Sequence, residues 1–241
     1  MEIFTKNLIV NMSQCDKNAQ MRELDIFSTF LDSATEHGKL MGVAAPDLAK
    51  FNLFWVITKN KFRFYRKPYV LQNYSLTTWP KKPDLIRSNR FCEFFDDNGV
   101  FAEAKSEWVM LDKSSFKVSK HSVAYPNDLV HSEKTILDEP WLKVNNDFST
   151  CDFEYNYLVN SQDIDLSQHM NNIAYLRAMF SVLSSDKINS LNILEMEVHY
   201  LRQCFEGDNL SIRFIGTDYG FMVGFTKENQ LCTFINVIVN K

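Results

Sequence analysis

The order of the predicted elements repeats once along this chain, and that repeat limits the fold more than any other feature. Apolar residues spaced three and four apart predict one helix within residues 25–42 and a second over 171–183. Gly42 stands where a helix C-terminus is commonly capped. Stretches rich in β-branched and aromatic residues, separated by turn residues, lie before and after each helix. Each half therefore predicts one helix packed on an antiparallel sheet.

The two halves also share the details of this pattern. The first helix is expected to bury one stripe, consisting of Ile26, Phe30, Leu31, Ala34 and Leu40. The second is expected to bury Ile173, Leu176, Met179, Phe180 and Leu183. The expected strands are 4–12, 51–65, 74–80, 86–96 and 102–112 in the first half, and 153–160, 193–204, 209–216, 220–227 and 231–239 in the second. Short sequence fragments are similar as well: Phe64-Tyr65-Arg66 in the first half parallels Tyr200-Leu201-Arg202 in the second.

A long helix wrapped by an antiparallel sheet is the hot-dog architecture, and its presence twice predicts an α+β fold of the tandem, or double, hot-dog type. We expect a first hot-dog domain over residues 1–112, a polar connecting segment over 113–148, and a second hot-dog domain over 149–241. Single hot-dog units usually pair as dimers. A tandem chain supplies both members of such a pair, and a homodimer of the whole chain stays an open alternative.

Composition excludes several classes of function. No run of 18 or more apolar residues is present, so no membrane insertion is expected, and the N-terminus lacks a signal-peptide pattern, which predicts a cytoplasmic protein. The sequence pI near 5.8 gives no support for nucleic-acid binding. The five cysteines form no Cys-x-x-Cys pair and the histidines show no metal-ligand spacing. Neither a metal nor a cofactor is therefore expected.

Three polar residues immediately before the second helix are the candidates for chemistry. Asp165, Ser167 and His169 alternate, so an extended segment would point all three side chains to one side. The unsatisfied N–H groups at the start of the helix could stabilise the oxyanion that forms when a carbonyl is attacked. The alternative is helix capping by Asp165, Ser167 or Asn171, with His169 as a polar loop residue. These residues alone leave both interpretations open.

The run from Asp163 to Asn172 resembles the Asp-x-Asp-x-Asn-x-His-x-Asn-Asn signature of plant and bacterial acyl-acyl-carrier-protein thioesterases. The resemblance extends over nearly the whole chain. It also includes Ala34–Gly42, Trp55, Arg66–Pro68, Thr77–Trp79, Arg90–Gly99 and Trp108–Asp112.

This resemblance implies hydrolysis of fatty acyl thioesters on acyl carrier protein. The positions that match the family's catalytic residues are Asp165, Ser167, His169 and Gln203, and the paired Asn171 and Asn172 are expected to bind substrate. The family generally has Asn at position 167 and Glu at position 203. Because glutamine cannot accept a proton, Asp165 becomes the main candidate to activate water or to attack the thioester directly.

Two alternatives remain for activity and one for the partner surface. The chain could prefer acyl-coenzyme A, or it could bind acyl carrier protein without catalysis because of Ser167 and Gln203.

The first 120 residues carry 18 Lys and Arg against 14 Asp and Glu, so the first half is the expected docking site for an acidic carrier. Lys59, Lys61 and Arg63 alternate along one predicted strand and are the docking candidates. The alternative is a solvated strand face that discourages edge pairing.

Cys204 has two interpretations as well. A Cys–His nucleophile pair with His169 would need a lowered thiol pKa. Cys204 also shares the apolar side of its predicted strand with Met196 and Val198, which favours a buried core thiol.

Overall fold

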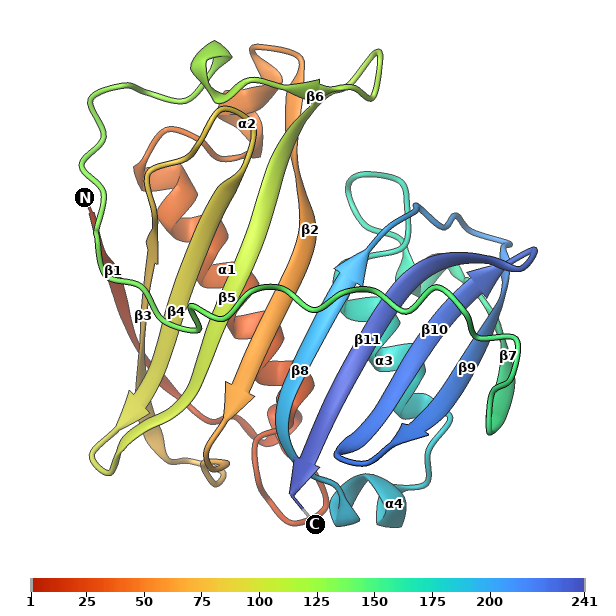
Figure 1. Cartoon of the computed structure of the whole chain (residues 1–241). Helices are drawn as coiled ribbons and strands as arrows, with labels where there is room; N and C mark the ends of the chain where they lie inside the picture. Colours follow the sequence, from red (N-terminus) through yellow and green to blue (C-terminus); the bar gives the residue numbers. More distant parts are fainter. Residues whose placement is uncertain (1, 241) are drawn as a thin grey trace. The chain divides into compact units, whose positions relative to one another are not determined.

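The computed structural model describes residues 2–240, and its backbone separates into two compact units, Met1–Glu139 and Pro140–Lys241 (Figure 1). Residues 113–139 group with the first unit, where β6 (Val118–Ser119) pairs with β5 (Gly99–Asp112). Within the described residues, no helix has the length and apolar character needed to cross a membrane.

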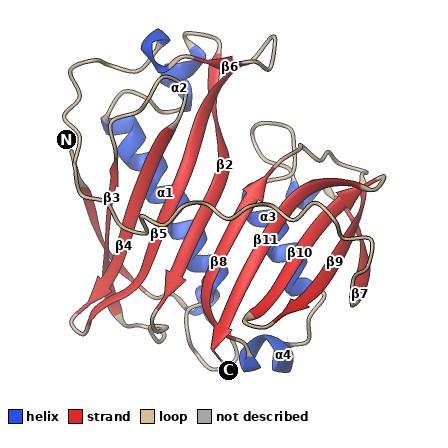
Figure 2. Cartoon of the chain, in the orientation of Figure 1, coloured by secondary structure: helices blue, strands red, loops and turns tan. Residues whose placement is uncertain are grey.

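The first unit consists of one long helix on an antiparallel sheet (Figures 1 and 2). Its five main strands are hydrogen-bonded in the order β1-β3-β4-β5-β2, and every neighbouring pair is antiparallel. Its remaining elements are β1 (Phe4–Ile9), η1 (Met12–Gln14), α1 (Glu23–Leu40), α2 (Ala45–Ala49), β2 (Leu53–Phe64), β3 (Asn73–Pro80), β4 (Ser88–Asp96) and η2 (His121–Val123).

The second unit repeats this arrangement with a shorter helix. Its strands follow the order β7-β9-β10-β11-β8, again antiparallel throughout. Its elements are β7 (Phe153–Leu158), η3 (Ser161–Asp163), α3 (Asn172–Ser181), α4 (Ser185–Ser190), β8 (Asn192–Tyr200), β9 (Asn209–Thr217), β10 (Gly220–Lys227) and β11 (Gln230–Asn240). The predicted α+β tandem hot-dog fold is thereby confirmed.

Aromatic packing fills the core of each unit. In the first unit the Phe62 ring contacts the α1 residues Phe27 and Phe30, with ring centroids 4.8 and 5.9 Å apart. In the second unit the α3 residue Tyr175 packs against Tyr200 and Phe225, at 5.8 and 5.3 Å. Each aromatic ring buries a large apolar area against the sheet, so these contacts hold the helix in place.

The ends of three predicted elements differ from the sequence expectation. Leu40 is 59% exposed rather than buried, because α1 ends there and Gly42 (φ 72°) reverses the chain. The helix α3 ends at Ser181 rather than at residue 183, because the Ser184 side chain caps a new helix, α4. The strand β8 ends at Tyr200, so the residues that follow it form a loop.

Candidate active site

The candidate site is carried by the loop between β7 and α3, and a buried carboxylate anchors that loop. The Asp163 side chain is 2% exposed in relative area. Its Oδ2 accepts hydrogen bonds from the Asn160 backbone N–H at 3.0 Å and from the Tyr157 hydroxyl at 2.9 Å. Burial, with the hydrogen bond to this carboxylate, raises the pKa of Tyr157 to about 12. Asp163 therefore shapes the loop, a role that sequence reasoning did not assign.

The residues that follow form a tight turn, so the extended segment considered from sequence is absent here. Ile164 and Met170 form an isolated antiparallel bridge. Between them the Gln168 N–H donates to the Asp165 carbonyl at 3.0 Å, and Gln168 adopts φ 64°. Asp165, Ser167 and His169 therefore lie on one side because of the turn, and not because side chains alternate along a strand.

Ser167 lies between the acid and the imidazole. Its backbone N–H donates to Asp165 Oδ1 at 2.8 Å, and its hydroxyl forms a short hydrogen bond to the same oxygen. The hydroxyl oxygen also lies 3.4 Å from His169 Nδ1. Because a hydroxyl has a single proton, donation to the carboxylate leaves its oxygen to accept from Nδ1–H. This assignment makes Nε2 of His169 the unprotonated ring nitrogen.

The other ring nitrogen of His169 is unoccupied by protein groups. Nε2 is buried and has no hydrogen-bond partner among residues 2–240. A neutral imidazole with a bare nitrogen can accept a proton, and a nearby carboxylate stabilises the cation that results. The three residues can therefore work as an acid–hydroxyl–imidazole relay.

Gln203 lies beside this loop through a backbone hydrogen bond. The N–H of Met170, next to His169, donates to the carbonyl of Cys204, next to Gln203, at 2.7 Å. Gln203 itself is exposed and belongs to the loop after β8, outside the strand that the sequence predicted for 193–204. Gln203 therefore directly precedes the residue that contacts the loop.

The helix cap is Asn171. Its side-chain oxygen accepts from the Ile173 N–H at 2.9 Å, and its own N–H donates to the Asp163 carbonyl at 2.7 Å. The carbonyl of Asn172, the first helical residue, accepts from the Tyr200 hydroxyl at 3.1 Å. Capping therefore occupies the amide oxygen of Asn171, while the side chains of Asp165 and Ser167 bond to each other.

Cys204 is a core residue. It has no exposed surface, and the hydrogen bond that its thiol donates to the Cys232 sulfur, together with burial, raises its pKa well above the ordinary range. A thiol in this state is not a nucleophile. The core interpretation is confirmed for burial, although Cys204 lies beyond the end of β8.

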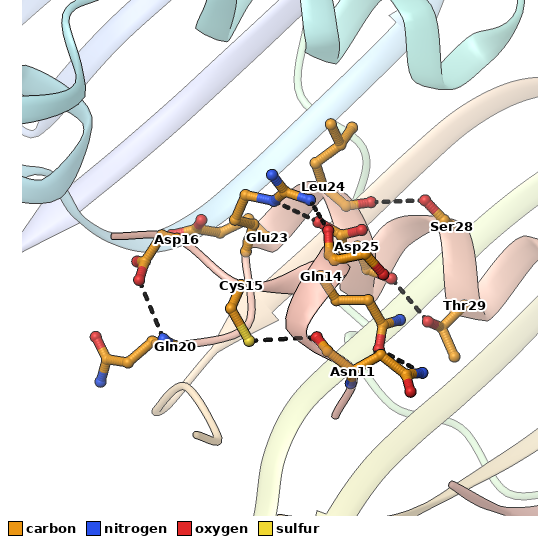
Figure 3. Close-up of polar contacts among 12 residues, drawn as sticks. Asn11, Gln14, Cys15, Asp16, Gln20, Glu23, Leu24, Asp25, Ser28 and Thr29 are labelled. Atoms are coloured by element: carbon orange, nitrogen blue, oxygen red, sulfur yellow. Dashed lines mark hydrogen bonds and ion pairs between the residues drawn. The ribbon is translucent and has the colours of Figure 1, made fainter. Parts of the chain in front are cut away.

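The same loop exists in the first unit, with different side chains (Figure 3). Asp16 corresponds to Asp165, since the Asn18 N–H donates to Asp16 Oδ1 at 2.8 Å, as Ser167 does to Asp165. Gln20 occupies the position of His169, and its N–H also donates to Asp16 Oδ1, at 3.1 Å. The first unit therefore repeats the scaffold of the loop and lacks the imidazole.

The neighbouring backbone contact is repeated too. The Met21 N–H donates to the Pro68 carbonyl at 2.9 Å, as Met170 donates to Cys204. Lys67 therefore holds the position that Gln203 holds in the second unit, and its ammonium lies 2.6 Å from a carboxylate oxygen of Glu23. A lysine–glutamate ion pair replaces the neutral amide, so only the second unit offers an uncharged group beside an imidazole.

The three expected docking cations are less available than their alternation on β2 suggests. Lys61 is buried at 4% exposure, so the prediction that it is a surface docking group is wrong. Lys59 lies 3.0 Å from a carboxylate oxygen of Glu107, and Arg63 lies 2.7 Å from one of Glu139. Both charges already have anionic partners within the first unit.

Two family models match this chain. The model of the acyl-ACP thioesterase N-terminal domain matches residues 1–125, and that of the acyl-ACP thioesterase C-terminal domain matches residues 148–239.

Individual relatives are distant in sequence. A chloroplastic acyl-[acyl-carrier-protein] hydrolase of Cuphea viscosissima is 23% identical over 202 residues, which are 78% of this chain and 48% of that protein. A chloroplastic palmitoyl-acyl carrier protein thioesterase of Gossypium hirsutum is 21% identical over 217 residues, covering 84% and 52%. The chain thus spans about half the length of these relatives.

Solved structures share the fold over almost the entire chain. An acyl-ACP thioesterase from Bacteroides thetaiotaomicron has a TM-score of 0.86 at 20% identity, covering 99% of this chain and 98% of that one. A 12:0-ACP thioesterase from Umbellularia californica has a TM-score of 0.83 at 15% identity, covering 99% and 97%. Since the two family models together match most of the sequence, this chain belongs to the acyl-ACP thioesterase family.

Proposed function

We propose that this protein hydrolyses fatty acyl–acyl carrier protein thioesters, releasing a free fatty acid and the holo-carrier. The observation that carries the proposal is the relay from Asp165 through Ser167 to His169, whose Nε2 is buried and has no partner within the described part of the chain. Membership of the acyl-ACP thioesterase family supports the class of substrate.

The proposed base is His169 Nε2. A water molecule placed between Nε2 and the thioester carbonyl gives its proton to Nε2 while its oxygen bonds to the carbonyl carbon. The imidazolium that forms keeps its Nδ1–H on Ser167, whose hydroxyl is held by the Asp165 carboxylate. The carboxylate stabilises the developing positive charge through this hydroxyl, which is the role of the acid in related triads.

Collapse of the tetrahedral intermediate then breaks the C–S bond. The departing thiolate takes the proton from Nε2, which returns the imidazole to its starting state. This departure needs little assistance, since a thiol has a pKa of about 8.5. The partial positive charge at the start of α3 stabilises the oxyanion of this intermediate.

Gln203 contributes without carrying a proton in this scheme. Its amide can donate to the attacking water or to the carbonyl oxygen, but it cannot replace a carboxylate as a base. This chemistry assigns proton transfer to His169. We propose that Asn172 contacts the substrate near the start of α3, while Asn171 serves chiefly as the helix cap.

The test is thiol release from a panel of acyl–acyl carrier protein substrates of increasing chain length. Asp165→Asn and His169→Ala should each lower kcat by about 10²–10⁴, the usual contribution of general acid–base groups. The first unit offers matched controls at equivalent positions, because Asp16→Asn and Gln20→Ala change the twin loop, which has no imidazole. Equal losses from both pairs of substitutions would indicate a structural effect and reject the proposed base.

Two other activities are distinguished by the same assay. A preference for coenzyme A appears as a higher kcat/KM on acyl-coenzyme A than on acyl–acyl carrier protein. A non-catalytic carrier-binding protein, suggested by Ser167 and Gln203, would release no thiol above the His169→Ala variant at any chain length. Activity gained by Gln203→Glu would then identify that position as the cause.

We propose that the carrier protein approaches the basic part of the first unit, since residues 1–120 carry 18 Lys and Arg against 14 Asp and Glu. Lys59 and Arg63 are half-buried contributors, and each would have to exchange an existing carboxylate partner for one on the carrier. Such an exchange gains little affinity and mainly affects orientation. An unchanged KM for the carrier substrate in Lys59→Glu and Arg63→Glu variants across a range of salt concentrations would reject these two residues as docking groups.

A further inference from the structure

The first unit carries an additional hairpin at one end of its sheet. Residues 113–117 join β5 to β6, and within the described residues β6 pairs with β5 alone. The second unit has no counterpart of this hairpin among its described elements. The hairpin therefore lies outside the helix-on-sheet arrangement that the two units share.

The turn between α2 and β2, residues 50–52, lies beside this hairpin (Figure 1). The Lys113 N–H donates to the Asn52 carbonyl at 2.8 Å, and the Asn52 side-chain amide donates to a carboxylate oxygen of Asp112 at 3.0 Å. The two segments thus form one surface. We call residues 50–52 and 112–120 together the basic tip.

Apolar side chains are exposed on the basic tip. Phe51 is 51% exposed, Phe116 is 60% exposed and Val118 is 50% exposed. The Phe116 ring meets that of Phe54 edge-on at 6.2 Å, and Phe116 adopts φ 55°, a strained conformation for a bulky residue. Exposed apolar side chains that gather at one place mark interaction surfaces, whereas scattered ones do not.

The available charges of the basic tip are positive. Three of its lysines are exposed and have no carboxylate partner among residues 2–240, namely Lys113, Lys117 and Lys120. The two carboxylates in and beside the tip are already engaged. Asp47 lies 3.2 Å from the Lys50 ammonium, and Asp112 accepts hydrogen bonds from the turn itself. Cations next to exposed phenylalanines complement a partner that is anionic and apolar at once.

The backbone of the hairpin turn has its hydrogen bonds within the protein. The N–H groups of Ser114 and Ser115 donate to Asp112 Oδ1 at 3.1 and 2.8 Å, and the Phe116 N–H donates to the Asp112 carbonyl at 2.8 Å. Contact with lipid requires such internal partners, because lipid cannot replace the hydrogen bonds of water. Protein–protein interfaces commonly retain bridging water and carry no such requirement. The turn therefore fits a lipid surface better than a protein partner.

We propose that the basic tip attaches this protein peripherally to an anionic lipid surface. The three free lysines contact the phosphates of the headgroups, while Phe51 and Phe116 reach the boundary between headgroups and acyl chains. Apolar contact and electrostatic attraction are each weak alone and add to one another in this arrangement. The attachment goes beyond thioester hydrolysis and does not depend on it.

The first experiment is sedimentation of the full chain with lipid vesicles. Vesicles of phosphatidylcholine and phosphatidylglycerol in equal parts should bind the protein, and the bound fraction should fall as salt is added, because salt screens the attraction of the lysines. Vesicles of phosphatidylcholine alone should bind little. Absence of binding to the anionic vesicles, or equal binding to both kinds, would overturn the proposal.

The second experiment separates the two contributions. The double variant Lys113→Gln/Lys117→Gln should lower the partition coefficient on anionic vesicles by about tenfold or more, since each basic residue near such a surface contributes to binding. Phe51→Ser/Phe116→Ser should cause a loss of similar size through lost apolar contact. Thermal melting of each variant checks the fold.

The second unit offers matched controls for both double variants. Phe153 of β7 is 64% exposed, and Lys187 of α4 is exposed as well. Phe153→Ser and Lys187→Gln should bind anionic vesicles like the parent. Equal losses from the control and the tip variants, with normal melting, would show that vesicles bind without using the basic tip.

An acidic carrier protein is the competing partner for the same lysines. Tip variants that bind vesicles like the parent but have a raised KM for acyl–acyl carrier protein would assign this surface to the carrier and reject the lipid. An unchanged KM together with lost vesicle binding is the expected result.

Discussion

The backbone N–H and the hydroxyl of Ser167 both donate to the same carboxylate oxygen of Asp165, Oδ1. This double contact holds the serine hydroxyl between the carboxylate and the His169 ring. The hydroxyl of Ser167 therefore connects the Asp165 carboxylate with the His169 ring.

The first prediction concerns that bridge. Ser167→Ala removes the hydroxyl and leaves Nδ1 of His169 without its partner, so kcat should fall by about 10²-fold, near the lower limit for general acid–base groups. Ser167→Asn should retain most of the activity, because an amide oxygen can accept from Nδ1–H. Steady-state kinetics on one acyl–acyl carrier protein substrate provide the measurement. An unaffected kcat in Ser167→Ala would show that the Ser167 hydroxyl has no role in catalysis.

The second prediction concerns the anchor of the loop. Asp163→Ala leaves the Tyr157 hydroxyl and the Asn160 N–H without their acceptor, which should lower the free energy of unfolding by about 2 kcal/mol. Asp163→Gln should recover much of this loss. In the first unit Gln14 performs the same task, as its side-chain oxygen accepts from the Asn11 N–H at 2.9 Å. Urea unfolding of both variants tests the comparison, and equal destabilisation would contradict it.

The third prediction is a pH dependence of stability in the first unit. The hydrogen bonds from the Arg66 guanidinium hold the pKa of Asp96 below its usual value, and Gln72 donates to the same carboxylate at 2.6 Å. A lowered folded-state pKa stabilises the protein above the unfolded pKa of about 3.9, and this contribution is lost as pH falls through the folded pKa.

Asp96→Asn should therefore cost about 2 kcal/mol at pH 7, and its deficit relative to the parent should shrink as pH falls below about 4. Denaturant unfolding at several pH values measures this difference. A deficit that stayed constant with pH would mean that the ion pair contributes nothing and that the loss is one of packing.

The fourth prediction separates Cys204 from catalysis. Because burial and the Cys232 thiol raise its pKa, Cys204 should resist alkylation by iodoacetamide in the native protein, whereas the partly exposed Cys151 should react first. Cys204→Ala should keep kcat within about threefold of the parent, since the substitution removes a small buried side chain and no reacting group. Loss of activity on selective modification of Cys204 would instead support Cys204 as the nucleophile.

Periodicity in the sequence predicted the elements of both units and their order. The lead-in strand, the helix and the four strands recur because each helix must bury an apolar stripe against a half-buried sheet. Element ends were less predictable. Leu40 continues the apolar pattern of α1 but lies where Gly42 reverses the chain, and β8 ends before Gln203 although the pattern continues. Turn geometry overrides periodicity at such positions.

The sequence by itself determined the duplicated helix-on-sheet fold and the presence of an acid, a hydroxyl and an imidazole before the second helix, because both depend on local spacing. Tertiary structure alone decided that these side chains meet through a turn closed at Gln168, that Lys61 is buried, and that Gln203 lies beside the loop through the Met170–Cys204 hydrogen bond. These outcomes depend on contacts between residues distant in sequence and on positive backbone dihedrals, neither of which has a periodic signature.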